Sequence, residues 1–240
     1  MNNIALITVI HDIEGKCLKV FNKAKDKFKK LYENVYITVS EETSVKLREE
    51  LIKNGFKVKI IPKKGAANAR REVLKFGLSG EEEYFHYCDF DRILTWIDNY
   101  YLELIDIVNS IHNYDYLILG RTPRAFNTHP IEWIETEKIT NKIFSIETGL
   151  HADITAGACG FSRECGQCIS ENSQDKMTDG EWPMIVYRIM KKDISYKAVE
   201  GLEYIEDVNG YSKEVKDSDK WFVRLKLSYI ISESIMRKRT

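Results

Sequence analysis

Strand-like and helix-like segments alternate along the amino-terminal half of this 240-residue chain, and this alternation constrains the fold more than any other feature. Residues 4–10, 34–40 and 56–61 form short runs rich in β-branched side chains. Between these runs, apolar residues recur every three or four positions among lysines, as they do in amphipathic helices. Because a helical crossover returns the chain to the same end of a sheet, consecutive strands of this kind pair in parallel. The pattern predicts an α/β fold built on a parallel central sheet.

The same pattern continues through the rest of the chain, where no linker, internal repeat or low-complexity segment marks a boundary. We expect further elements in this order: helix 66–78, strand 84–88, helix 96–111, strand 115–120, helix 131–148, strand 153–162, helix 180–192 and strand 194–199. These elements make one domain, 1–240. It divides into a first half (1–125), a second half (126–210) and a helical tail (211–240).

Composition excludes several classes of protein. A hydrophobic content of 43% supports a continuous core, and 36 basic against 37 acidic residues leave a net charge of −1, unlike the basic field of a nucleic-acid binder. The opening MNNIALITVI lacks a basic leader and a cleavage site, so we interpret it as a strand. No apolar run approaches the roughly 20 residues that a transmembrane helix needs. We therefore expect a cytoplasmic protein that does not bind nucleic acid.

The five cysteines include one C-x-x-C motif, formed by Cys165 and Cys168, with Cys159 upstream. A structural zinc site needs four ligands, and no second pair of cysteines or bracketing histidine accompanies this motif. We expect ordinary reduced thiols rather than a metal or redox site.

Two aspartates one residue apart follow the strand-like run in YFHYCDFDR, residues 84–92. Carboxylates are costly to bury unless they are paired, so Asp89 and Asp91 indicate either a bound cation or a solvated turn. In an open α/β sheet, ligands bind beyond the carboxyl ends of the strands, which is where this pair falls. A hard cation such as Mg²⁺ or Mn²⁺ can take one or two protein oxygens there and complete its shell with phosphate oxygens. The placement favours the metal interpretation.

With these motifs in order, the chain resembles nucleotide-sugar-dependent glycosyltransferases of the GT-A fold, and most of all their family-2 type. The matching stretches are IALITVIHD, VYITVSEETS, GAANARREVLKFGL and YFHYCDFDR, which cover most of residues 1–125. The resemblance implies a mixed, mostly parallel sheet flanked by helices, a nucleotide-sugar-binding half followed by an acceptor-side half, and a divalent cation held by Asp89 and Asp91.

A second match lies downstream, in ITAGACGFSRE and MTDGEWPMIVYRIMKKDISYKAV. In inverting members of the family an acidic residue at this place acts as general base on the acceptor hydroxyl. The candidates are Asp179 and Glu181, at the start of a helix whose dipole favours a carboxylate. Helix capping explains the same two acids without any catalysis. Both interpretations stay open, as do inversion and retention.

The resemblance also implies residues that contact the donor. Arg70 matches the family's arginine, and its guanidinium fork suits a diphosphate, as does that of Arg92 beside the acidic pair. Asp89 is expected to reach both the metal and the nucleotide sugar. His11 and Asp12 stand in place of the family's usual P-x-Y-N, and Ser40 stands in place of D-D-G-S. The identity of the nucleotide is therefore left open.

Two histidines and two tryptophans of the second half have alternative interpretations. His151, and less directly His129, could supply a third metal ligand, although most lone histidines are not ligands. Trp133 and Trp182 could stack on a sugar ring, but core packing is the commoner role.

The tail combines aromatic and aliphatic residues with a basic end, RKR at 237–239. It could lie on an anionic membrane surface, which would place the protein at the inner membrane face and near lipid-linked acceptors. The interpretation that we prefer is a carboxy-terminal helix docked on the sheet.

The sequence thus predicts a metal-dependent glycosyltransferase that moves a sugar from a nucleotide-diphosphate donor to an acceptor hydroxyl. The acceptor is a glycan, a lipid-linked molecule or a small molecule. One alternative is a haloacid-dehalogenase-type phosphatase that uses DFDRI, although such enzymes carry the motif after the first strand. Another is a non-catalytic binding protein of the same fold, which would leave the acidic pair unexplained.

Overall fold

A computed structural model describes residues 3–210 and 215–237 of the chain. Helices and strands alternate through the first half as expected. They are β1 (Ile4–Ile10), α1 (Cys17–Leu31), β2 (Asn34–Ser40), α2 (Val45–Lys53), β3 (Lys57–Ile61), α3 (Ala66–Leu78), β4 (Tyr84–Cys88), α4 (Phe90–Asn99), α5 (Tyr101–Ser110), the 3₁₀ turn η1 (Ile111–Asn113) and β5 (Tyr116–Arg121).

The second half holds fewer strands and longer helices. It comprises α6 (Pro123–Phe126), α7 (Ile131–Thr148), β6 (Ala158–Ser162), α8 (Arg163–Asn172), α9 (Thr178–Ile185), the π-helical turn η2 (Val186–Met190), β7 (Ile194–Val199), α10 (Glu206–Asn209) and α11 (Asp217–Met236).

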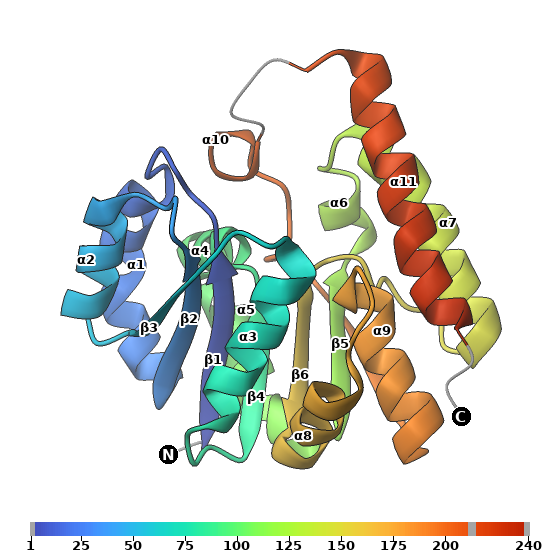
Figure 1. Ribbon diagram of the computed structural model, residues 1–240, viewed down its shortest axis with the longest axis horizontal. Coiled ribbons are helices and arrows are strands. Elements are labelled where there is room, and N and C mark those ends of the chain that lie inside the picture. Colours follow the sequence, from blue (N-terminus) through green and yellow to red (C-terminus); the bar gives the residue numbers. More distant parts are fainter. Residues whose placement is uncertain (1–2, 211–214, 238–240) are drawn as a thin grey trace.

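The strands form a single mixed sheet in the order β3-β2-β1-β4-β6-β5-β7. All neighbouring pairs are parallel except those of β6, which runs antiparallel to both β4 and β5. This architecture confirms the predicted α/β fold with a mostly parallel sheet flanked by helices in one domain. Because β1, β2 and β4 are parallel, the loops that follow them meet at the same edge of the sheet (Figure 1).

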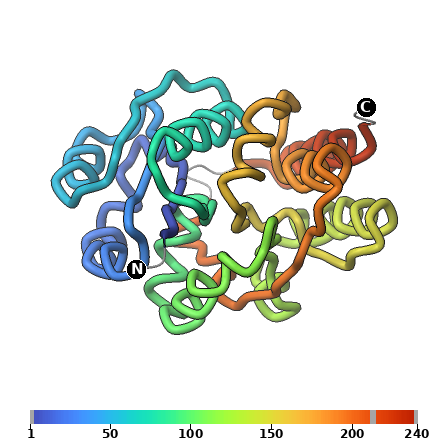
Figure 2. Tube along the Cα trace, turned by 90° about the horizontal axis from the view of Figure 1, so that it is seen from below, coloured from blue at the N-terminus to red at the C-terminus, as the bar shows by residue number. Residues whose placement is uncertain are grey.

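Each face of the sheet carries its own apolar core. One is built on Phe21 and Phe28 of α1 together with Phe90 and Trp96 of α4. The other joins Val73 of α3 to residues of β4, β6, α8, α9 and α11. Figure 2 shows the amino-terminal segments on one side of the molecule and α7, α9 and α11 on the other.

Three predicted elements differ from the observed ones by more than one residue. Helix 96–111 is two helices, and the first begins at Phe90, directly after Asp89. Strand 153–162 begins only at Ala158, because Asp153 is held in a polar network and Gly157 has a φ of 71° that a strand does not adopt. Helix 180–192 contains Pro183, which has no backbone N–H to donate, and it passes into the π-helical turn at Val186.

The helical tail packs against α7 and α9 (Figure 1). Arg237 reaches Asp175 at 2.5 Å, whereas Lys238 and Arg239 of the basic end lie outside the described residues. Over the part of the chain that the structure describes, no helix combines the length and apolar character needed to cross a bilayer.

Candidate functional site

Two cavities open at the edge of the sheet where the parallel strands end, and Asp89 and Asp91 line both of them. The β1–β3 cavity, of about 480 Å³, is bounded by the ends of β1, β2 and β3, the start of α3 and the segment 208–210. The α7–α11 cavity, of about 200 Å³, is bounded by α7, α11 and the segment 155–157. The acidic pair therefore stands at the boundary between two places where ligands could bind.

Asp89 is held from two sides at the amino-terminal end of α4. Its Oδ1 accepts a hydrogen bond from the hydroxyl of Tyr87, and its Oδ2 accepts one of 2.9 Å from Nη2 of Arg70. Gly157 lies so close that a Cβ there would come within 2.7 Å of Oδ2. The backbone of residue 157 and its positive φ thus require glycine and leave room for this carboxylate.

Asp91 lies on the first turn of α4 and is contacted from a distant segment. Its Oδ2 accepts a hydrogen bond of 2.7 Å from Nδ2 of Asn209, at the end of α10. Burial raises the pKa of Asp91, and the neighbouring Asp89 raises it too, so that it stays above its usual value although Arg92 lowers it. Both effects disfavour negative charge at this place, so a cation between the two carboxylates would relieve it.

These residues fit a hard divalent cation in the chemistry of their donor atoms. Two carboxylates one residue apart, open to a cavity that could hold phosphate oxygens, are the kind of incomplete ligand set that Mg²⁺ and Mn²⁺ take up. Neither of the two histidines considered as a third ligand is placed to complete the set. His151 is exposed in the loop before β6 and lines neither cavity, while His129 is buried against the carbonyl oxygen of Ala125. Within the described ranges, no three His, Cys, Asp or Glu side chains are grouped to hold a metal.

Arg70 connects the acidic pair to the second predicted acidic motif. Nη1 of this buried guanidinium donates to Oδ2 of Asp179 at 2.6 Å and to the hydroxyl of Thr178, while Nη2 donates to Asp89. Burial would lower the pKa of Arg70, but Asp179 and Asp89 together raise it well above its usual value. The arginine is therefore a permanent cation that fixes both carboxylates.

The structure separates the two acids of the TDGE motif. The side chain of Asp179 is 5% exposed and lines the α7–α11 cavity beside Asp89. Glu181 is fully buried on another side of the same helix and accepts hydrogen bonds from the hydroxyl of Ser173 and the backbone N–H groups of Gln174 and Asp175. Glu181 thus holds the loop before α9, and of the two acids only Asp179 lines the α7–α11 cavity.

The residues predicted to contact the donor meet in the β1–β3 cavity, with one exception. Nδ1 of His11 and the hydroxyl of Ser40 are 2.7 Å apart. Asp12 lines the same cavity, but its two oxygens accept the backbone N–H groups of Lys16 and Cys17 and so anchor the start of α1. The exception is Arg92, which lines the α7–α11 cavity instead.

Two arginines and a tryptophan form one wall of the α7–α11 cavity. The guanidinium of Arg224 lies 3.0 Å from the ring centroid of Trp133, and that of Arg92 lies 6.0 Å from it. Trp133 is thus half-buried beneath charged groups at the cavity, whereas Trp182 is packed in the core against Tyr87.

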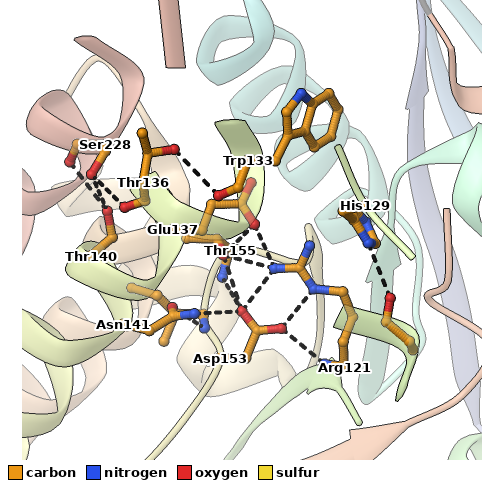
Figure 3. A network of polar contacts seen from close by, with 12 residues as sticks. Arg121, His129, Trp133, Thr136, Glu137, Thr140, Asn141, Asp153, Thr155 and Ser228 are labelled. Carbon is orange, nitrogen blue, oxygen red and sulfur yellow. Dashed lines mark hydrogen bonds and ion pairs between the residues drawn. The ribbon is translucent and has the colours of Figure 1, made fainter. Parts of the chain in front are cut away.

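Behind this wall lies a buried polar network centred on Arg121 (Figure 3). Nε of Arg121 donates to Oδ2 of Asp153 at 2.7 Å, and Nη2 donates to Glu137 of α7 at 2.7 Å. Asn141 also donates to Asp153. The network joins the end of β5 to α7 and to the loop before β6, and thereby fixes the position of both elements at the cavity.

Three site residues were not anticipated from the sequence. They are Asn209, Arg224 and the network residue Arg121. Each lies in a segment whose local pattern is that of an ordinary loop, helix or strand end, so the sequence carries no local signal for them. A glycine before a strand, as at Gly157, is a weak signal of close backbone approach.

The chain is similar in fold to solved structures of glucosyl-3-phosphoglycerate synthase from Mycobacterium tuberculosis. The complex of that enzyme with phosphoglyceric acid matches with a TM-score of 0.59 and 10% identity, over 99% of this chain and 81% of that one. Its complex with Mn²⁺, UDP-glucose and glycerol 3-phosphate matches with a TM-score of 0.57 and 10% identity over the same shares. Its complex with Mn²⁺, UDP and phosphoglyceric acid matches with a TM-score of 0.58 and 9% identity, over 99% of this chain and 80% of that one. No family model matches the chain, and no curated protein matches it. The likeness is one of fold, and it agrees with the GT-A architecture expected from the motifs.

Proposed function

We propose that this protein is a metal-dependent glycosyltransferase that moves a sugar from a nucleoside-diphosphate donor to an acceptor hydroxyl. One observation carries the proposal: Asp89 and Asp91 lie at the boundary between two cavities at the carboxyl ends of the parallel strands. A transfer reaction needs a donor site and an acceptor site that meet at one reacting atom. When bound by Asp89 and Asp91, a divalent cation would neutralise the charge of the departing diphosphate.

The β1–β3 cavity is the better fit to the donor. It is the larger of the two, and the start of α3 at Ala66 lines it, so backbone N–H groups and the helix dipole favour an anionic diphosphate there. Lys63, Lys64 and Arg70 add positive charge to the same cavity. His11 and Ser40 lie at its β1–β2 side, where the base or ribose of the nucleotide would be placed.

The α7–α11 cavity is the better fit to the acceptor. Asp89, Asp91 and Asp179 make one side of it acidic, whereas the opposite wall, at Arg92 and Arg224, would favour an anionic group. Three guanidinium groups, those of Arg92, Arg121 and Arg224, are set against two carboxylates, those of Glu137 and Asp153. One positive charge is therefore in excess in this wall of the cavity. A small hydroxy compound with a phosphate or carboxylate group would balance it. Glycerol 3-phosphate and phosphoglyceric acid, which are present in complexes of the fold neighbours, are compounds of this kind.

Asp179 is our candidate for the general base. It lies on the acceptor side of Asp89, and Arg70 orients its carboxylate. Glu181, the other predicted candidate, accepts hydrogen bonds from the 173–175 loop instead. The α7–α11 cavity is small and polar, so it gives no comparable support to a lipid-linked acceptor. The same holds for a contact of the tail with a membrane.

The proposal is tested by release of nucleoside diphosphate from a panel of nucleotide sugars, with Mn²⁺ or Mg²⁺ and with EDTA. We expect metal-dependent release that is stimulated by acceptors carrying a phosphate or carboxylate, and less by their neutral counterparts. Replacing both Asp89 and Asp91 by Asn should reduce turnover by about a hundredfold or more, because the cation loses its protein ligands.

Other outcomes identify the alternatives. Metal-dependent release of phosphate from monoesters, without cleavage of nucleotide sugars, would indicate the phosphatase. A folded protein that binds UDP but turns over no donor in the panel would indicate the binding protein. A double Asn variant with wild-type turnover would contradict the role of the acidic pair.

A further inference from the structure

Helix α11 is apolar on two opposite sides, although only one of them is covered. Its inner side packs on the body of the protein through Ser228, Ile231, Ser234 and Ile235. Its outer side presents Phe222, Leu225, Tyr229 and Met236, which are 55 to 68% exposed. A surface helix normally has one apolar and one polar side, and a helix that is apolar all round is normally buried all round.

Exposed apolar side chains are concentrated around this helix. Among the described residues, nine of the seventeen large hydrophobic side chains that are exposed belong to α7 and α11. They are Ile131, Ile139 and Ile146 of α7 and Trp221, Phe222, Val223, Leu225, Tyr229 and Met236 of α11. Single exposed hydrophobic residues are ordinary, but a concentration on two packed helices indicates an interaction surface.

Charge argues against an anionic membrane as the partner. The exposed charged residues within α11 are Asp217, Asp219, Lys226 and Glu233, and the exposed bases Lys216 and Arg237 flank the helix, so that three acids stand against three bases. Peripheral helices that bind anionic lipids carry an excess of Lys and Arg beside the apolar side. Arg237, just beyond the helix, is engaged by Asp175.

The spacing of the outer residues fits another helix instead. Phe222, Leu225, Tyr229 and Met236 follow the three- and four-residue steps of a helix–helix seam, with half-buried Ser232 at the remaining step. Lys226 and Glu233 flank the seam on the same side, seven positions apart. When two copies of such a helix cross antiparallel about a two-fold axis near Tyr229, Lys226 of each faces Glu233 of the partner subunit.

We propose that the protein forms a two-fold symmetric homodimer through an antiparallel pair of α11 helices. The inner side of the same helix carries Arg224 and Ser228, which line the α7–α11 cavity. The partner helix would therefore support a wall of the proposed acceptor site, although the dimer itself does not depend on the assignment of that site.

The proposal is tested by the mass of the full chain in solution, measured by light scattering and by sedimentation over a concentration series. We expect twice the 28.0 kDa mass of the chain. Tyr229→Glu should give a monomer, because it sets two carboxylates against each other at the axis. Leu102→Glu, a matched change at a 77% exposed leucine of α5, should leave the dimer intact.

Orientation is tested by exchanging the flanking charges. Lys226→Glu and Glu233→Lys should each weaken dimerisation about tenfold, because each places like charges opposite one another at two symmetric positions. The double variant should recover wild-type dimerisation. A wild-type chain that is monomeric at every concentration, dimers unaffected by Tyr229→Glu, single variants that the double variant does not rescue, or flotation of a monomer with anionic vesicles would each overturn the proposal.

Discussion

At the scale of single residues, the site depends on charges that are buried and compensated. Arg121 is 4% exposed, and its guanidinium is surrounded by the carboxylates of Asp153 and Glu137 and the hydroxyl of Thr155. Burial would raise the pKa of Asp153, but Arg121 outweighs burial and holds that pKa well below its usual value. Removing one partner of such a buried ion pair lowers the free energy of unfolding, because the charge of the other partner stays buried without compensation.

Asp153→Asn is therefore expected to reduce the free energy of unfolding by about 3 kcal/mol at neutral pH. Because the pKa of Asp153 is depressed in the folded state, its stabilising contribution is complete above its unfolded value near 3.8 and is lost as the pH falls below that value. The difference between wild type and variant, measured by urea denaturation, should shrink over the same acidic range.

The matched control is Asp106→Asn, at an exposed carboxylate of α5, which should change the free energy of unfolding little. If Asp153→Asn were as stable as this control at pH 7, the ion pair would not be holding the network together.

At the scale of an element, the first turns of α9 perform two tasks with two acids. Residues two apart on a helix point to different sides, so Asp179 reaches Arg70 while Glu181 reaches the 173–175 loop. In the sequence, this spacing leaves capping and catalysis open for both acids. In the fold, Glu181 holds the loop before α9, and Asp179 lines the α7–α11 cavity, where we propose that it acts as general base.

Variants of the two acids should therefore behave differently. Asp179→Asn is expected to lower kcat by about a hundredfold or more, as loss of a general base does, and also to reduce the free energy of unfolding, because Arg70 loses a buried partner. Glu181→Ala should lower the free energy of unfolding by about 3 kcal/mol, because three donors lose a buried acceptor, and should leave the kcat of the folded protein little changed. Steady-state kinetics and denaturation of both variants separate the effects.

Asp193→Asn, an exposed acid in the loop before β7, serves as the control for both measurements. A kinetic loss confined to Glu181→Ala, in protein that is as stable as wild type, would reverse the assignment of the two acids.

At the scale of the whole molecule, the order of the strands brings the halves of the chain together. Strand β4 lies between β1 of the first half and β6 of the second. The acidic pair that follows β4 therefore contacts residues of both halves. Arg70 and Asp179 are 109 positions apart in the sequence, and Asp91 and Asn209 are 118 apart. A ligand that binds here connects the two halves of the molecule.

Binding should therefore stabilise the molecule as a unit. If UDP with Mn²⁺ binds as proposed, then at roughly 100 times its Kd it should add about 2.7 kcal/mol to the stability of the folded state. For a chain of this size we expect a rise in Tm of about 5 to 10 °C in one cooperative transition, measured by calorimetry.

The rise should be absent with EDTA and in the variant with Asn at positions 89 and 91. An equal rise in Tm without metal would show that the acidic pair does not connect the nucleotide to both halves. So would a rise that is limited to one of two separate unfolding transitions.

Most elements were predictable because their signals are local. Helix 131–148 and strand 194–199 have the predicted bounds, and β1 and β2 do as well, since periodicity and turn chemistry act within a few residues. The predicted helix 96–111 starts too late, because the acidic pair is interpreted from the sequence as a polar segment that follows the strand. In the structure Asp89 comes directly before the first residue of the helix.

The sequence by itself determined the alternation of strands and helices, the position of the acidic pair at the end of β4 and the two acids of α9. Only the tertiary structure decided which of these side chains meet. It brought Asn209 to Asp91, turned Glu181 away from the site, set Arg92 in the α7–α11 cavity and left His151 exposed. The reason is physical: local pattern fixes the direction of a side chain within its own element, whereas its partners depend on which strands pair and in what order.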